Sequence, residues 1–448
     1  MTDIVLLGAG ASVEAQVPDA FHMTRVIVER FRSDPSLRRE SRIVSFVVGG
    51  LQFQAAAAGG HPYSGVNVED LFNAVQLLAQ RKKLEAAPFV GSWHTMVEEF
   101  DKRDPAQARL DRFTRELYQT VAEQIMRALA LRPPSFAHDK IDRTLQNLIK
   151  KAIDATIKKQ PFSSSGDSVG KAVGEYLTEM AHKWSEQLKR GTPRSRYEAD
   201  REFAAAVDQR QARPGTGQAY HRANEAMIKA LAQIVWINET SRVQYLTPIL
   251  EKLSSQPRLI VATLNYDNAV ELLATSNEVG FDTGIDEWST TGEFPLADQT
   301  LHILKLHGSI DWSISPGAQD PDRPLPHSEI HRVSPEEVAS GQHRPAVVFG
   351  QRNKLTAQGP YLELLRTFQR ELAKSQRLTV VGYSFRDDHV NEYIAQWFNG
   401  ASDRLLQIVD PSLNTEAAPF ARDLLSCGPS RVTHISRPAG DGLRALVT

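Results

Sequence analysis

Five short polar turns hold the side chains that could do chemistry, and each directly follows an apolar run. They are Gly-Ala-Gly-Ala-Ser at 8–12, Thr-Leu-Asn-Tyr-Asp at 263–267, Lys-Leu-His-Gly-Ser at 305–309, Gly-Tyr-Ser-Phe at 382–385 and Val-Asp-Pro at 409–411. Ligands of open α/β sheets bind beyond the carboxyl ends of the strands, so side chains there are well placed for chemistry. The order of the five turns is far more specific than any one of them.

The first turn contains Gly8, Ala9, Gly10 and Ser12 and could bind a phosphate group. Glycines let backbone amides approach a pyrophosphate, and the N-terminus of a following helix favours negative charge. A dehydrogenase fingerprint would place a third glycine where this chain has Val13, followed by a second strand that ends in an acidic residue about 20 residues further on. Neither is present, and a tight turn without a ligand is the alternative.

The next two turns offer Asn265, Asp267 and His307. Asn and Asp also favour ordinary Asx turns, and a lone His is more often a packed residue than a catalyst. Two acids between the first and the second turn, Glu69 and Asp70, lie where a helix is expected to begin. There they stabilise the helix dipole, and we favour this capping role over a catalytic one.

The elements that must position these turns are strands at the two ends of the chain. Most of the runs are short, continuous and rich in Val, Ile and Leu, which is typical of a parallel sheet buried on both faces. Helices are expected between several of them, for example over 361–374 and 387–398, and this alternation predicts a Rossmann-like α/β sheet. The predicted strands are 4–7, 258–263, 301–306, 346–349, 378–381, 405–409 and 432–435.

Between about residue 30 and residue 250, the apolar residues recur three or four apart, as they do in helices. The pattern predicts a large all-helical insertion. Its expected helices cover 68–80, 106–131, 141–157, 169–188 and 218–236.

Composition excludes several classes of protein. The 448 residues carry 52 basic and 54 acidic side chains, so no global positive field indicates nucleic-acid binding. We see no signal peptide and no apolar run long enough for a membrane span. Cys427 is the single cysteine, so no intramolecular disulfide and no cysteine-held zinc or iron–sulfur site can form. These features predict a cytoplasmic protein, and we expect no metal site.

The ordered turns resemble those of the sirtuin superfamily. The matching pieces are Gly-Ala-Gly-Ala-Ser with Val-Pro-Asp-Ala-Phe at 17–21, then Thr-Leu-Asn-Tyr-Asp, Leu-His-Gly-Ser and Gly-Tyr-Ser. They are most similar to the SIR2-like NAD-hydrolysing domains of bacterial antiphage defence. The resemblance predicts a NAD-binding catalytic domain made of residues 1–30 and 255–448, with a helical insertion domain at 31–254.

The resemblance also implies roles for individual residues. Asn265 and His307 would be the catalytic pair. The other implied residues bind NAD⁺: Gly8, Ala9, Gly10 and Ser12 at the pyrophosphate, Asp19 and Phe21 near the nicotinamide, Asp267 beside the nicotinamide and its ribose, Gly382 and Ser384 at phosphate or ribose, and Asp410 at the adenosine ribose.

The chemistry of nicotinamide release agrees with this pair. Bond cleavage gives an oxocarbenium-like sugar cation, and the charged leaving group needs no acid. Asn265 can orient water or the ribose, and His307 can take a proton. Protein-deacylating sirtuins hold zinc with four cysteines, which this chain lacks.

The sequence therefore predicts an enzyme, a NAD⁺ glycohydrolase that forms nicotinamide and ADP-ribose. By resemblance it would be a homo-oligomeric antiphage effector that depletes NAD⁺ with a HerA-like ATPase or a short Argonaute as partner. Two alternatives stay open. One is a protein deacylase or ADP-ribosyltransferase, and the other is a non-catalytic sensor of NAD or ADP-ribose.

Overall fold

The large sheet of the computed structural model has seven parallel strands in the order β10-β9-β8-β1-β2-β4-β3. The model describes residues 3–61, 65–84, 86–87, 90, 93–101, 217–253, 256, 258–298, 300–316, 328–340, 343–349, 359–416 and 418–447. The strands are β1 (Asp3–Leu7), β2 (Leu259–Thr263), β3 (Phe281–Asp282), β4 (Leu301–Lys305), β8 (Arg377–Val381), β9 (Leu405–Val409) and β10 (Val432–Ile435). The predicted Rossmann-like sheet is confirmed.

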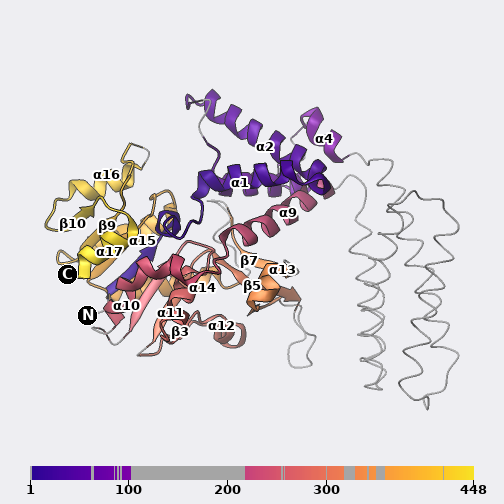
Figure 1. Ribbon diagram of the computed structural model, residues 1–448. Helices are drawn as coiled ribbons and strands as arrows, with labels where there is room; N and C mark the ends of the chain where they lie inside the picture. Colours follow the sequence, from indigo (N-terminus) through magenta and orange to yellow (C-terminus); the bar gives the residue numbers. More distant parts are fainter. Residues whose placement is uncertain are drawn as a thin grey trace, which may run out of the picture. The chain divides into compact units, whose positions relative to one another are not determined.

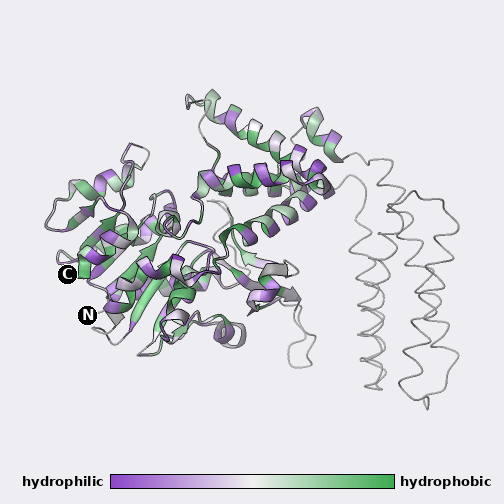
Figure 2. Ribbon diagram, viewed as in Figure 1, coloured by the Kyte–Doolittle hydropathy of each residue, from purple (hydrophilic) through white to green (hydrophobic). Residues whose placement is uncertain are grey.

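The strands are apolar because both faces of the sheet are covered. Every residue of β2 and β4 is buried, and Figure 2 shows the sheet dominated by hydrophobic residues. The helices that follow the strands also bury apolar residues. These are α11 (Ala269–Ser276), α12 (Ile285–Thr291), α14 (Tyr361–Lys374), α15 (Asp388–Asn399), α16 (Pro419–Ser426) and α17 (Ala439–Val447).

The strand order reverses beside β1, and this reversal decides where a ligand can bind. β1 pairs with β2 on one side and with β8 on the other, so Leu7 lies between Thr263 and Val381 at the carboxyl ends. The turns that follow diverge at such a reversal and leave a crevice. Three of the five polar turns therefore begin next to one another.

A small antiparallel sheet in the order β6-β5-β7 follows β4. Its strands are β5 (Gly308–Pro316), β6 (Ser328–Arg332) and β7 (Pro345–Val347), with α13 (Pro335–Ser340) between the last two. The predicted strand at 346–349 thus overlaps β7. It pairs with β5 and does not join the parallel sheet.

All elements described between β1 and β2 are helical. They are the 3-10 helices η1 (Ala9–Ser12), η2 (Pro35–Leu37), η3 (Arg81–Lys83) and η5 (Thr240–Leu246), and the α-helices α1 (Ala20–Ser33), α2 (Arg38–Ala57), α3 (Val68–Gln80), α4 (Thr95–Asp101), α9 (Gln218–Val235) and α10 (Thr247–Leu253). The predicted helices at 106–131, 141–157 and 169–188 lie outside the described residues.

The chain forms two compact units, one of residues Met1–Arg81 with Ala219–Thr448 and the other of Lys82–Gln218. In the first unit, α1, α2 and α3 pack on one another. The guanidinium of Arg30 in α1 donates to the side chain of Gln233 in α9, and Figure 1 labels α1, α2 and α9. These helices therefore share a unit with the sheet. The predicted domain limits at 31 and 254 stay a prediction.

Candidate functional site

A pocket of about 370 Å³ lies at the carboxyl ends of the parallel strands, a size typical of small-molecule sites. The turns after β1, β2, β4, β8 and β9 line it, together with residues from α1, α3 and α9. The structure brings every candidate residue to this pocket, although their roles stay predictions. They are Gly8, Ala9, Gly10, Ser12, Asp19, Phe21, Asn265, Asp267, His307, Gly382, Ser384 and Asp410.

The first turn is pressed against the turn after β8. The amide of Gly8 donates to Val381 O at 2.9 Å, and the amide of Gly10 donates to Gly382 O at 2.8 Å. A Cβ on Gly8 would lie 2.6 Å from Gly382 O. Close backbone packing thus requires glycine here, and these two amides already donate within the protein.

Asn265 is held in one orientation just after β2. Its Nδ2 donates to Gly8 O and to Ser12 Oγ, both at 2.9 Å, and its backbone amide donates to Thr263 Oγ1 at 3.0 Å. The Oδ1 atom accepts no hydrogen bond from the described residues. Because Asn265 lines the pocket, this oxygen is the atom of the amide that can accept from a ligand or a water molecule.

His307 follows β4 and is 3% exposed. Its Nε2 lies 3.1 Å from Oδ2 of Asp387, which is also buried. Its Nδ1 is buried and has no hydrogen-bond partner among the described residues. One ring nitrogen of His307 is therefore within hydrogen-bond distance of a carboxylate, and the other could take part in proton transfer.

Asp19, Asp267 and Asp410 all use a carboxylate oxygen to order a turn. Asp19 caps α1 by accepting from two amides at 2.9 Å. Asp267 accepts from Ala269 N at 3.0 Å, and Asp410 accepts from Ser412 N at 2.8 Å. Each carboxylate thus holds its own loop while lining the pocket.

The rim of the pocket carries a cation next to an aromatic ring. The guanidinium of Arg386 lies 5.2 Å from the ring centroid of Phe21, whose side chain is 36% exposed. Exposed Ser384 lies two residues before Arg386 on the same turn. The rim therefore carries a cation and a hydroxyl group, which are groups that bind anions in proteins.

Residues 259–420 match the family model of the SIR2-like domain. This part of the chain is a SIR2-like domain. The predicted sirtuin-like resemblance is confirmed, and with it an NAD-related function of the sirtuin kind. The matched range holds the turns with Asn265, His307, Gly382 and Asp410. No curated protein matches the chain.

Several pocket residues of the SIR2-like domain and its surroundings were missed from sequence. Tyr266 lies within Asn-Tyr-Asp, and Arg386 and Asp387 directly follow Gly-Tyr-Ser-Phe, so their places in or next to the predicted motifs were an available signal. Glu69 was considered from sequence and assigned to helix capping, and it lines the pocket at the start of α3, where Asn67 accepts from its amide at 2.8 Å. Leu231 and Val235 of α9 gave no signal, because they match an ordinary buried helix face.

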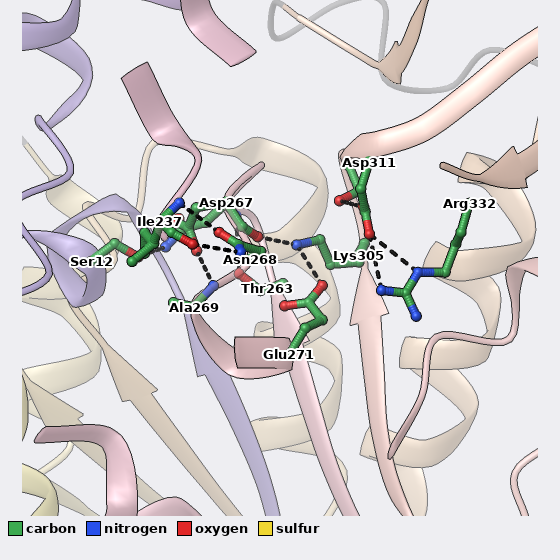
Figure 3. A network of polar contacts seen from close by, with 12 residues as sticks. Ser12, Ile237, Thr263, Asp267, Asn268, Ala269, Glu271, Lys305, Asp311 and Arg332 are labelled. Atoms are coloured by element: carbon green, nitrogen blue, oxygen red, sulfur yellow. Dashed lines mark hydrogen bonds and ion pairs between the residues drawn. The ribbon is translucent and has the colours of Figure 1, made fainter. Parts of the chain in front are cut away.

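A buried polar network holds the turn that contains Asp267 and Asn268 (Figure 3). Lys305 is fully buried, donates to Asp267 O and lies 3.0 Å from Glu271 Oε1. Asn268 exchanges two hydrogen bonds with the backbone of Ile237, at 2.9 and 3.0 Å. Burial raises the pKa of Glu271, and the charge of Lys305 opposes that rise.

In the described part of the chain, no three His, Cys, Asp or Glu side chains are grouped closely enough to hold a metal ion. No helix there is long and apolar enough to cross a membrane.

Proposed function

We propose that the chain is a NAD⁺ glycohydrolase, which converts NAD⁺ and water into nicotinamide, ADP-ribose and a proton. The observation that carries the proposal is the convergence of Asn265 and His307 on one pocket of a SIR2-like domain. SIR2-like domains use NAD⁺, so the pocket is the natural place for this substrate.

The pocket residues fit the parts of the substrate. Arg386, Ser12 and Ser384 offer a cation and hydroxyl groups for the pyrophosphate, and Asp410 offers carboxylate oxygens for ribose hydroxyl groups. In this proposal Gly8, Ala9, Gly10 and Gly382 form the surface on which the phosphates lie. Asp19, Phe21 and Asp267 surround the nicotinamide.

Asn265 and His307 divide the reaction between them. The bond from ribose C1′ to the nicotinamide nitrogen breaks, and its electron pair neutralises the departing ring. Water forms the new bond to C1′. Asn265 Oδ1 accepts a hydrogen bond from the water or from a ribose hydroxyl, and His307 takes the proton. General-base catalysis of this kind contributes about 10²- to 10⁴-fold.

The amino-acid composition of the chain favours hydrolysis of NAD⁺ over protein deacylation. With Cys427 as its single cysteine, the chain has no four-cysteine zinc module of the kind found in deacylating sirtuins. Deacylation would make nicotinamide release depend on an acylated peptide. A sensor would bind NAD⁺ without turnover.

We also propose, by resemblance alone, that the activity serves antiphage defence by depleting NAD⁺ in the cytoplasm. The chain would act as a homo-oligomer, with a HerA-like ATPase or a short Argonaute as partner.

The test follows nicotinamide release from NAD⁺ by the purified chain, with and without candidate partners and an acylated peptide. We expect peptide-independent release that falls at least about 100-fold in Asn265→Ala and His307→Ala. Asn399→Ala and His331→Ala are matched controls, because both residues are exposed and neither lines the pocket. Full release by the first two variants would contradict the catalytic assignment.

A further inference from the structure

His307 and Asp387 are 80 residues apart in the chain, yet their side chains meet at 3.1 Å inside the protein. We infer that Asp387 is a positioning residue, which fixes the tautomer and ring orientation of His307 so that Nδ1 is the atom that takes the proton. This inference rests on the proposed function for its chemistry. Its geometry stands independently of the reaction.

Asp387 is itself held rigidly. It is the N-cap of α15, and its Oδ1 accepts from His389 N at 3.1 Å and Val390 N at 3.4 Å. The hydroxyl of Tyr383 donates to Asp387 O at 3.1 Å and lies 3.0 Å from Asn391 Oδ1. One carboxylate oxygen thus caps the helix, which leaves Oδ2 for His307.

The turn that delivers Asp387 has an unusual backbone. Gly382 has φ of 59° and Phe385 has φ of 53°, a region that a residue such as Phe rarely adopts. Strain of this kind persists where the surroundings enforce it. Here the ring of Phe385 is buried in the core and its carbonyl oxygen accepts from Asn391 Nδ2 at 2.8 Å.

The carboxylate decides which nitrogen of His307 carries the proton. An ionised carboxylate can only accept hydrogen bonds, so Nε2 is the protonated nitrogen of the neutral ring. The lone pair then lies on Nδ1, the atom that is buried and without a partner among the described residues. When Nδ1 takes the proton from water, the ring becomes a cation that the carboxylate of Asp387 stabilises. The same logic governs the His–Asp pair of serine proteases.

The decisive variant is Asp387→Asn, because asparagine keeps the size of the side chain and also caps helices well. Its amide can donate to Nε2, which would place the proton of the ring on Nδ1. We expect kcat for nicotinamide release to fall by about 10²- to 10⁴-fold with KM changed less than about threefold. Asp387→Glu should recover part of kcat. Asp388→Asn is the control, since exposed Asp388 does not line the pocket.

A second measurement reports on the tautomer without any turnover. Nitrogen-15 NMR of histidine-labelled protein should show His307 protonated at Nε2 in the wild type and at Nδ1 in Asp387→Asn, its signals identified by their loss in His307→Ala. Unchanged kcat or an unchanged tautomer in Asp387→Asn would overturn the inference. If the wild type releases no nicotinamide, the proposed function fails, and the tautomer still decides the role of Asp387.

Discussion

Gly382 is the residue on which the packing of two pocket turns depends. A Cβ there would lie 2.2 Å from Ala11 N and 2.3 Å from Gly10 C, and φ is already in the left-handed region. We therefore expect Gly382→Ala to lower the free energy of unfolding by about 2–4 kcal/mol, since a steric clash adds to the backbone penalty. Urea denaturation measures this loss.

Gly428→Ala is the matched control for Gly382→Ala. Gly428 has φ of 89°, but nothing lies within 4 Å of the added Cβ. Only the backbone penalty of about 1–2 kcal/mol should appear. Equal losses in the two variants would show that the contact with the first turn does not matter.

A single site residue was predictable where its position directly after a strand is sufficient to bring it to the pocket. The candidates such as Asn265 and His307 follow strands, and the carboxyl ends of parallel strands share one edge of the sheet. Asp387 was not predicted as a partner of His307. That contact depends on the position of α15 relative to β4, which no local pattern reveals.

At the scale of elements, the buried Lys305–Glu271 pair joins β4 to α11, and Lys305 also donates to the backbone of pocket residue Asp267. Lys305→Met removes the cation and leaves a buried carboxyl, so we expect the free energy of unfolding to fall by about 3–5 kcal/mol near neutral pH. Burial raises the pKa of Glu271 above its ordinary value of 4.5, and loss of Lys305 raises it further.

The raised pKa of Glu271 determines the direction in which the stability of the fold changes with pH. Between the unfolded-state pKa of Glu271 and its higher folded-state pKa, the folded state holds a proton that the unfolded state has lost, so stability falls as pH rises across this interval. In Lys305→Met the fall between about pH 5 and pH 8 should be larger than in the wild type. Urea denaturation across this range tests it. Lys305→Met with Glu271→Gln is the control, and an equally steep fall there would contradict the assignment to Glu271.

Helices whose apolar residues recur with a clear period were predictable, whereas some of the strands were missed. α3 and α14 have the predicted limits because their apolar residues form one stripe. β3 has two residues and no pattern of its own. β5 was missed although Ile310, Trp312 and Ile314 alternate with polar residues, the signature of a strand with two unlike faces.

At the scale of the whole molecule, the pocket is built from segments far apart in the sequence. The predicted insertion at 31–254 contains the start of α3 and the end of α9, and both line the pocket next to the turns of the sheet. A helix that closes a wall of the pocket was not foreseeable, because its buried face looks the same whether it covers a ligand or a core.

Because both sheet turns and helices line the pocket, we predict that a bound ligand slows amide hydrogen exchange in both. An unreactive NAD⁺ analogue in which a carbon replaces the ribose ring oxygen should slow amide exchange around 264–267 and 382–387, and equally around 67–69 and 231–235, because all of these contain lining residues. Peptides from β6 and α13 are the internal control, since they do not line the pocket. Protection confined to the turns of the sheet would show that α3 and α9 take no part in binding. Protection in all four segments would mean that the helices between β1 and β2 complete the site.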